Sequence, residues 1–296
     1  MRIAVVTTSF PAGEHDPSGH FVRAEARELE AQGHEVVLVA PPPGGAFGWP
    51  GVAARVRERP ARLLDAGRWV LEARTRLARI EAQRVVAHWA VPCAWPVATP
   101  SRAELEVVSH GGDVRLLVRM PRPARTRIVR AIAGKAARWR FVSAALKDSL
   151  LEALDRGARR LVERVAVVEE ARLEMPDVRE AVARKKRELG TARVAVSVGR
   201  LVPSKGVHRA IEHVARTREV DALVVVGDGP ERGRLETLAG ARDVDVRFLG
   251  VVPRDEALAW IGAATVVLFA SRHEGSSSVL REAAAMGTRV VMVRDA

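Results

Sequence analysis

The sequence predicts an α/β protein made of two doubly wound, Rossmann-like domains, each built around a parallel sheet. Short β-branched runs alternate with stretches of helical composition along the whole chain. The runs are almost continuously apolar, which is typical of parallel strands covered by helices on both faces. With 296 residues, of which 48% are hydrophobic, the chain exceeds one domain of roughly 100 to 200 residues.

The expected strands follow one another in order along both halves. The first half contains four runs, RIAVVTTS, HEVVLVA, RVVAHWA and LEVVSH. The second half contains RVAVSVG, ALVVVG, VRFLG, TVVLFAS and RVVMV, with helices expected at about 205–218, 231–239, 255–263 and 278–286. Ligands of such sheets bind beyond the carboxyl ends of the strands, so a site is expected in the loops that follow them.

A domain boundary is expected in the stretch EEARLEMPD, at 169–177. There the apolar strand RVAVV gives way to charged residues and a proline. We therefore expect a first domain at 1–170 and a second domain at 171–296.

The positive charge is concentrated in the first half. The formal net charge is +12; residues 1–165 hold 27 Lys and Arg against 17 Asp and Glu, whereas 166–296 hold 21 against 19. Between Asp113 and Asp148, ten basic residues and no acidic one accompany Ile128, Val129, Ile132 and Trp139. Such a tract suits an anionic membrane surface or nucleic acid, or is only a solvated face rich in arginine. Nucleic acid is the weaker choice, because aromatic residues do not alternate with the basic ones.

Several other classes of protein are disfavoured. The single cysteine, Cys93, excludes a disulfide framework and a multi-cysteine zinc site. The start MRIAVVTTSFP has no small-residue cleavage site and reads as a first strand, and no apolar stretch approaches the roughly 20 residues of a membrane-spanning helix. Asp and His clusters with metal-ligand spacing are missing, so we expect no metal. We expect a cytoplasmic protein, peripheral at most on the inner face of the membrane.

Two cations stand in the loop after RVAVSVG. In GRLVPSKG, Arg200 and Lys205 precede a helix. Free backbone N–H groups and the helix dipole add to these charges, and together they suit a diphosphate. An ordinary loop that happens to be basic explains the stretch equally well. The glycine-rich turn in GDGPERGRLE is weak evidence, because glycine and proline occur in any such turn.

A more specific signal is EGSSSVLREA, in which two glutamates enclose small and hydroxyl-bearing residues. A nucleotide sugar presents its sugar, two phosphates, ribose and base in that order. Glu274 can accept hydrogen bonds from sugar hydroxyls, and Glu282 can hold the ribose diol. The phosphate fits the helix start between them, at Ser276, Ser277 and Ser278. The competing interpretation, a capped helix with a surface glutamate, does not explain the acid before the cap.

These motifs and their order resemble those of the retaining glycosyltransferases of family four, which have the two-domain GT-B fold. EGSSSVLREAAAMGTRVV is similar to the glutamate-pair motif of the family, and GRLVPSKG, VVVGDGPERGRLE and FLGVVPRDEALAWIGAATVVLFAS precede it in the family's order and spacing. In the first half TTSFPAGEHDPSGHFVRAEARELEAQGHEVVLVAPP, HWAVP and VVSHGGDV match more loosely. The resemblance covers almost the whole chain.

The resemblance implies a donor site for a nucleoside-diphosphate sugar in the second half, with no separate cofactor. Arg200 and Lys205 would bind the diphosphate, and Glu274 the sugar. Glu282 would bind the ribose, and the backbone near Val251 would meet the base. Retaining members need no protein nucleophile, because the leaving phosphate can take the acceptor proton on the same face of the sugar.

The first half supplies further residues by resemblance. Gly19 in DPSGHF resembles the glycine of a loop that approaches the donor. His110 in SHGGD resembles the active-site histidine beside the transferred sugar, and Asp113 is expected to orient that loop. Taken alone, a histidine at a strand end is more often structural. His88 in HWAVP is expected to line the acceptor cleft.

The sequence departs from the family pattern near its end. Members continue past RVVMV with further strands and helices, whereas this sequence stops at Ala296, and Arg289 stands where proline is usual. The second domain is therefore expected to lack its usual C-terminal elements. The leading hypothesis is a glycosyltransferase acting on a glycan or lipid-linked acceptor. The alternatives are a truncated, non-catalytic binder of nucleotide or a partner, and a sugar-nucleotide epimerase, whose acidic and histidine residues differ from these.

Overall fold

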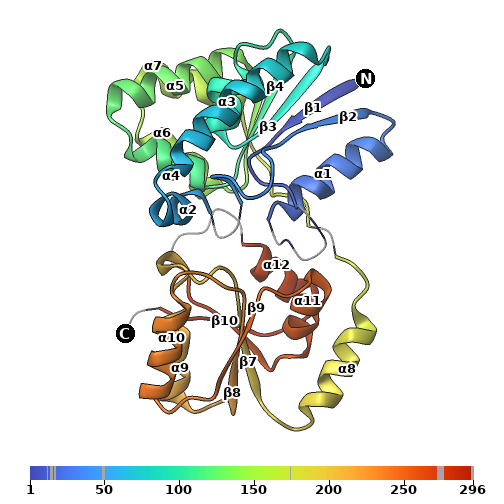
Figure 1. Cartoon of the computed structure of the whole chain (residues 1–296), viewed down its shortest axis with the longest axis vertical. Helices are drawn as coiled ribbons and strands as arrows, with labels where there is room; N and C mark the ends of the chain where they lie inside the picture. Colours follow the sequence, from blue (N-terminus) through green and yellow to red (C-terminus); the bar gives the residue numbers. More distant parts are fainter. Residues whose placement is uncertain are drawn as a thin grey trace. The chain divides into compact units, whose positions relative to one another are not determined.

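The computed structural model describes residues 1–11, 13, 16, 18–48, 51–173, 175–271 and 277–294. The chain forms two compact units. The first holds Met1–Phe10 and Ser18–Arg172, and the second holds Pro11–Pro17 and Leu173–Ala296. Each unit has its own parallel sheet with helices packed against it (Figure 1).

The first unit contains, in its described residues, a six-stranded parallel sheet of order β2-β1-β3-β4-β5-β6. The direction in which strands are added reverses between β1 and β3. The strands are β1 (Arg2–Val6), β2 (Glu35–Val39), β3 (Arg84–His88), β4 (Glu104–Ser109), β5 (Ala136–Phe141) and β6 (Ala166–Val168). The helices are α1 (His20–Ala31), α2 (Val52–Glu58), α3 (Arg62–Arg79), the irregular helical segment η1 (Ala90–Ala98), α4 (Gly112–Arg119), α5 (Arg122–Lys135), α6 (Ala144–Glu152) and α7 (Arg156–Val165).

Strand β5 is absent from the sequence prediction, because arginines interrupt its apolar residues. Trp139 of β5 is fully buried, while the neighbouring Arg138 is exposed. Helix α5 likewise turns its apolar residues into the core, at Ile128, Val129 and Ile132. The apolar residues of the basic tract are therefore core residues, and they do not accompany the arginines at the surface.

The second unit contains, within the part of the chain that is described, a five-stranded parallel sheet of order β11-β10-β7-β8-β9. Its strands are β7 (Val194–Val198), β8 (Ala222–Val226), β9 (Val246–Gly250), β10 (Val266–Phe269) and β11 (Val290–Met292). Its helices are α8 (Arg179–Leu189), the short 3-10 turn η2 (Pro203–Lys205), α9 (Val207–Thr217), α10 (Arg232–Ala241), α11 (Arg254–Ala263) and α12 (Ser278–Ala285). Each strand expected in this half is present.

Alternate residues of the inner strand β8 enter two separate cores. Leu223 and Val225 pack with α9 and α10, whereas Val224 and Val226 pack with α11 and α12. In Figure 1, α9 and α10 lie on one side of this sheet and α11 and α12 on the other. The two-residue period of a strand explains the division. The predicted fold class, two doubly wound α/β domains, is confirmed.

Glycines after β8 are required by the close approach of neighbouring backbone. Gly227 has a φ of 126°, and a Cβ there would lie 2.0 Å from the carbonyl oxygen of Gly199. A Cβ on Gly229 would lie 2.5 Å from the carbonyl oxygen of Leu201. The amide of Leu201 also donates to the carbonyl of Asp228 (2.9 Å). The loops after β7 and β8 therefore pack backbone to backbone, which only glycine permits.

We expect Gly227→Ala to destabilise the second unit by about 2 kcal/mol or more, because the new methyl group overlaps a backbone carbonyl at a φ that alanine rarely adopts. The matched control is Gly240→Ala in α10, where a Cβ meets nothing within 4 Å. There alanine should be neutral or stabilise by up to about 1 kcal/mol. Urea unfolding of the full chain measures both variants, and equal midpoints would contradict this packing.

Candidate functional site

The second unit gathers most of the predicted donor residues at one edge of its sheet. Arg200 and Lys205 follow β7, and α12 follows β10. Strands β7 and β10 are neighbours, and the direction of strand addition reverses between them. At such a switch point a crevice opens outside the carboxyl ends of the strands, and ligands bind there. The loop after β7 carries the predicted residues Arg200 and Lys205, and the segment after β10 carries Ser277 and then, in α12, Ser278 and Glu282.

Hydrogen bonds tie these two loops to each other. The hydroxyl of Ser271 donates to the carbonyl of Ser204 (3.2 Å). The buried guanidinium of Arg209 donates to the carbonyl of Ala270. This guanidinium lies against Gly206, where a Cβ would come 2.0 Å from Nη2. With a φ of 64°, Gly206 starts α9, and the turn that contains Lys205 is held beside the end of β10.

Glu282, the predicted ribose ligand, is buried in α12 with 4% of its surface exposed. Its Oε1 forms an ion pair with Nη1 of Arg254, the first residue of α11 (2.8 Å). Among the described residues, this oxygen accepts no hydrogen bond of regular geometry. A carboxylate held by one cation retains lone pairs for the hydroxyl groups of a ligand. The sequence did not indicate Arg254 as the partner of this glutamate.

The structure describes only some of the remaining predicted donor residues. Glu274 and Ser276 lie outside the described residues. Ser277 is 9% exposed and directly precedes α12. Val251 follows β9 and is 40% exposed, so its loop reaches the same carboxyl edge of the sheet. In the described part of the chain, no group of three or more His, Cys, Asp or Glu side chains is arranged to hold a metal ion.

In the first unit, Gly19 and His110 also follow the carboxyl ends of strands. Gly19 begins α1 with a φ of 66°, and a Cβ there would lie 2.0 Å from the carbonyl oxygen of Ser9. The close approach of this backbone is a structural reason for glycine at position 19. Asp113 accepts hydrogen bonds from the amides of Gly111 (3.0 Å) and Ala90 (2.8 Å). It therefore orients the loop after β4, as the sequence suggested, and joins this loop to the start of η1.

His110 and His88 are neighbours at the ends of β4 and β3. His88 is fully buried, and His110 is partly exposed. Nε2 of His110 lies 3.0 Å from Nδ1 of His88, with 12° between the ring planes. The rings therefore meet edge to edge through a hydrogen bond. Phe21 and Trp89 pack on the His110 ring, with centroid distances of 4.5 and 5.0 Å. His88 holds His110 from its buried side and, with no exposed surface, does not itself line a cleft as the sequence suggested.

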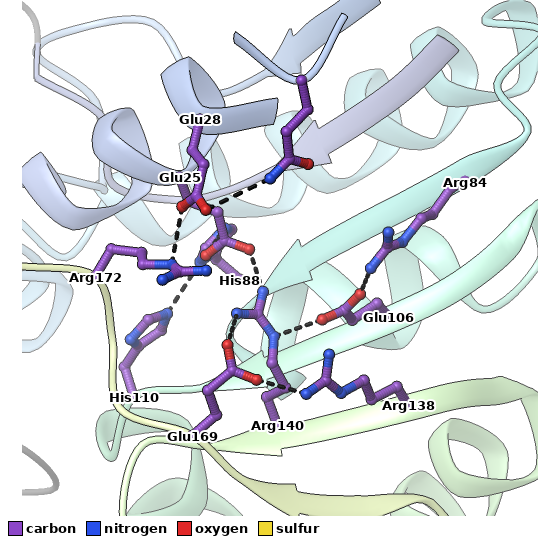
Figure 2. A network of polar contacts seen from close by, with 11 residues as sticks. Glu25, Glu28, Arg84, His88, Glu106, His110, Arg138, Arg140, Glu169 and Arg172 are labelled. Carbon is purple, nitrogen blue, oxygen red and sulfur yellow. Dashed lines mark hydrogen bonds and ion pairs between the residues drawn. The ribbon is translucent and has the colours of Figure 1, made fainter. Parts of the chain in front are cut away.

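A buried ion-pair network lies beside His88 (Figure 2). Arg140 of β5 is 6% exposed and binds Glu25 of α1. It also contacts Glu106 of β4, from Nε to Oε1 at 2.5 Å. Oε2 of Glu25 in turn lies 3.8 Å from Nε2 of His88. A continuous path of polar groups therefore connects Arg140 to His110.

Outer ion pairs complete the network. Arg84 pairs with Glu106, and Arg138 binds Glu169 at 2.5 Å. Glu169 lies 3.6 Å from Nη1 of Arg140. Each buried charge therefore has an opposite charge beside it, which a low-dielectric interior requires. The sequence did not indicate Glu25 or Arg140; a signal it did offer was a pair of histidines at the ends of successive strands.

Both imidazoles are neutral in this environment. Burial, with a contribution from Arg140, lowers the pKa of His88 to about 3. Burial is also the main cause that holds the pKa of His110 well below its usual value, and His88 adds to the effect. A neutral imidazole has one N–H donor and one acceptor nitrogen. One histidine therefore donates to the other, and each keeps one nitrogen for another partner.

Comparison with known proteins agrees with the geometry of the second unit. Residues 178–296 match the family of glycosyl transferases group 1. The lipopolysaccharide core biosynthesis glycosyltransferase LpsE of Rhizobium meliloti is 37% identical over 133 residues, which represent 44% of this chain and 34% of that protein. The match therefore spans about a third of the curated relative's length.

Solved structures match a larger part of the chain. Sucrose-phosphate synthase from Thermosynechococcus elongatus superposes with a TM-score of 0.71 at 19% identity, over 98% of this chain and 80% of that one. HepE of Anabaena, in complex with UDP and glucose, gives a TM-score of 0.66 at 18% identity and the same coverage. At these identities the likeness shows the fold. The chain has the GT-B fold, and its residues 178–296 match the glycosyl transferases of group 1.

Proposed function

We propose that the protein transfers a sugar from a nucleoside-diphosphate sugar to an acceptor, with retention at the anomeric carbon. The observation that carries this proposal is the set of groups at the switch point of the second unit. Arg200 and Lys205 follow β7, the start of α12 follows β10, and Glu282 lies one turn further along that helix. Cations beside a helix start suit a diphosphate, and a buried carboxylate suits a ribose diol.

In this proposal each part of the donor has its own ligand. Arg200 and Lys205 neutralise the diphosphate and replace a metal ion. Glu282, held by Arg254, accepts hydrogen bonds from the ribose, and the backbone near Val251 meets the base. Glu274 accepts hydrogen bonds from the transferred sugar.

The chemistry asks mainly for stabilisation of the leaving group. The bond from the anomeric carbon to the diphosphate breaks, and the acceptor oxygen forms its bond on the same face. The acceptor proton passes to the departing phosphate oxygen. Positive charge develops on the anomeric carbon and negative charge on the phosphate, so fixed cations beside the diphosphate lower the barrier. His110 is the proposed residue beside the transferred sugar.

The comparisons support a sugar donor and a glycan acceptor. HepE was solved with UDP and glucose. LpsE is named for the biosynthesis of the lipopolysaccharide core. We infer that this chain uses a nucleotide sugar and acts on a glycan or a lipid-linked acceptor.

We expect Arg200→Ala and Lys205→Ala each to weaken the binding of UDP or GDP by roughly 10- to 100-fold. Each removes a charge-assisted contact worth about 1.5 to 3 kcal/mol. Isothermal titration calorimetry with both nucleotides measures the change. The matched control is Arg193→Ala, at the opposite end of β7, where the arginine pairs with Asp221 (3.0 Å). If the variants bind the nucleotide as tightly as the control does, the assignment is wrong.

We expect Glu274→Ala and Glu282→Ala to have different effects. Glu282→Ala removes a ribose contact and should weaken the binding of the free nucleoside diphosphate as well as that of the nucleotide sugar. Glu274→Ala should leave the affinity for the nucleoside diphosphate unchanged. It should reduce the rate of sugar transfer by an amount on the order of a hundredfold, since the hydrogen bond from the sugar to Glu274 strengthens as charge develops in the transition state. Calorimetry and a product assay on both variants test this. Equal losses of diphosphate affinity would contradict the assigned order, and nucleotide binding without product in the unmodified protein would favour the non-catalytic alternative.

We also propose that the first unit docks on anionic membrane lipid through α3. Leu63, Leu64 and Leu71 are 65%, 68% and 66% exposed, and their spacing places them on one stripe of the helix. The exposed Arg68 and Arg74 lie beside this stripe. Apolar side chains flanked by arginine suit an anionic bilayer surface. No helix in the described ranges is long and apolar enough to span a membrane.

Sedimentation with lipid vesicles tests the membrane proposal. We expect the protein to bind phosphatidylglycerol vesicles at low salt, less at high salt, and phosphatidylcholine vesicles weakly, because salt screens surface charges. Leu64→Glu with Leu71→Glu should reduce the bound fraction severalfold. The control is Leu116→Glu in α4, which is 46% exposed and lies outside the stripe. Equal sedimentation with neutral and anionic vesicles would show that the arginines form a solvated face and do not bind anionic lipid.

A further inference from the structure

The polar groups around His88 form a chain with a defined direction. Figure 2 shows Arg140, Glu25, His88 and His110 in succession. They come from β5, α1, the end of β3 and the loop after β4. The arrangement links three distant parts of the sequence, in series, to one imidazole, that of His110.

The charge beside His88 determines which histidine donates. Glu25 is ion-paired with Arg140, and its Oε2 lies 3.8 Å from Nε2 of His88. This nitrogen is buried and has no hydrogen bond of regular geometry among the described residues. An N–H here faces the carboxylate favourably, whereas a lone pair would face negative oxygen. His88 therefore carries its proton on Nε2 and accepts at Nδ1.

The tautomer of His110 follows from that of His88. Nδ1 of His88 accepts, so Nε2 of His110, 3.0 Å away, must donate. Nδ1 of His110 then has no proton and is an acceptor. The hydrogen bond to His88, together with Phe21 and Trp89 on its other sides, fixes the plane of the His110 ring.

We propose that Glu25 and His88 are positioning residues that hold His110 in one plane and one tautomer, with Nδ1 as its free acceptor. This proposal rests on the proposed function only where it says which ligand group that acceptor nitrogen binds. An acceptor nitrogen recognises the O–H of a sugar or of the acceptor alcohol, and it does not bind a phosphate oxygen. His110 would thus select a hydroxyl group and leave the diphosphate to other residues.

The low pKa values of both histidines agree with this assignment. Burial lowers the pKa of His88 to about 3, and burial together with His88 lowers that of His110. Glu25 acts in the opposite direction on His110, and Arg140 acts with the burial. At neutral pH both rings are then neutral, which a single N–H···N hydrogen bond requires.

Nuclear magnetic resonance of the ligand-free full chain tests the proposal without any donor or turnover. The histidines are labelled with ¹⁵N, and the His110 signals are assigned by their loss in His110→Gln. We expect the proton of the shared hydrogen bond to be attached to Nε2 of His110 and to show a coupling to Nδ1 of His88. Both rings should be Nε2–H tautomers. A proton attached to Nδ1 of His88, or the absence of any N–H···N pair, would overturn the proposal.

Variants separate positioning from simple structural support. His88→Asn keeps an acceptor near the position of Nδ1 and should preserve the protected His110 proton, whereas His88→Leu should abolish it. Glu25→Gln should shift both rings toward mixed tautomers. Its control is Glu28→Gln on the same helix, where the glutamate pairs with Arg172 (2.8 Å). Identical spectra for the two glutamine variants would contradict a role for Glu25, and the unmodified protein decides the tautomer if a variant fails to fold.

Discussion

A parallel sheet covered on both faces confines polar chemistry to the ends of its strands. In both units the strand interiors are apolar, and helices exclude water from them. Side chains that bind a ligand must therefore stand in the loops after the strands. The switch points, between β1 and β3 and between β7 and β10, are where such loops diverge and leave room for a ligand. This constraint explains why candidate residues far apart in the sequence occur at equivalent places in the two sheets.

The buried ion pairs of the first unit are an exception to this apolar rule. Arg140 and Glu106 lie within the sheet, at 6% and 2% exposure. Taking these charges from water costs several kcal/mol each, and a well-packed apolar pair is often as stable. Stability alone therefore does not account for them. The contact of Arg140 with Glu25 and, through it, with His88 offers a reason for their presence, since a fixed charge favours one tautomer of a nearby imidazole.

The family match and the geometry support each other in the second unit. The group 1 match covers residues 178–296, the region that carries Arg200, Lys205 and Glu282. The glycines after β8 let the loops after β7 and β8 pack at backbone distance, which keeps the cationic loop close to the sheet. The first unit matches known proteins mainly through its fold, so the chemistry there depends on residues such as His110 and their surroundings.

The sequence by itself determined the α/β class, the order of most strands, and the loop positions of Arg200 and Lys205, because apolar runs and glycine-rich turns are local patterns. It missed β5, where Arg138 and Arg140 interrupt the apolar residues. It also missed the partners of the site residues, such as Arg254 of Glu282. Only the tertiary structure decided these, because ion pairs such as Glu25 with Arg140 join residues separated by 115 positions. Such pairing depends on strand order and helix packing, which no local pattern encodes.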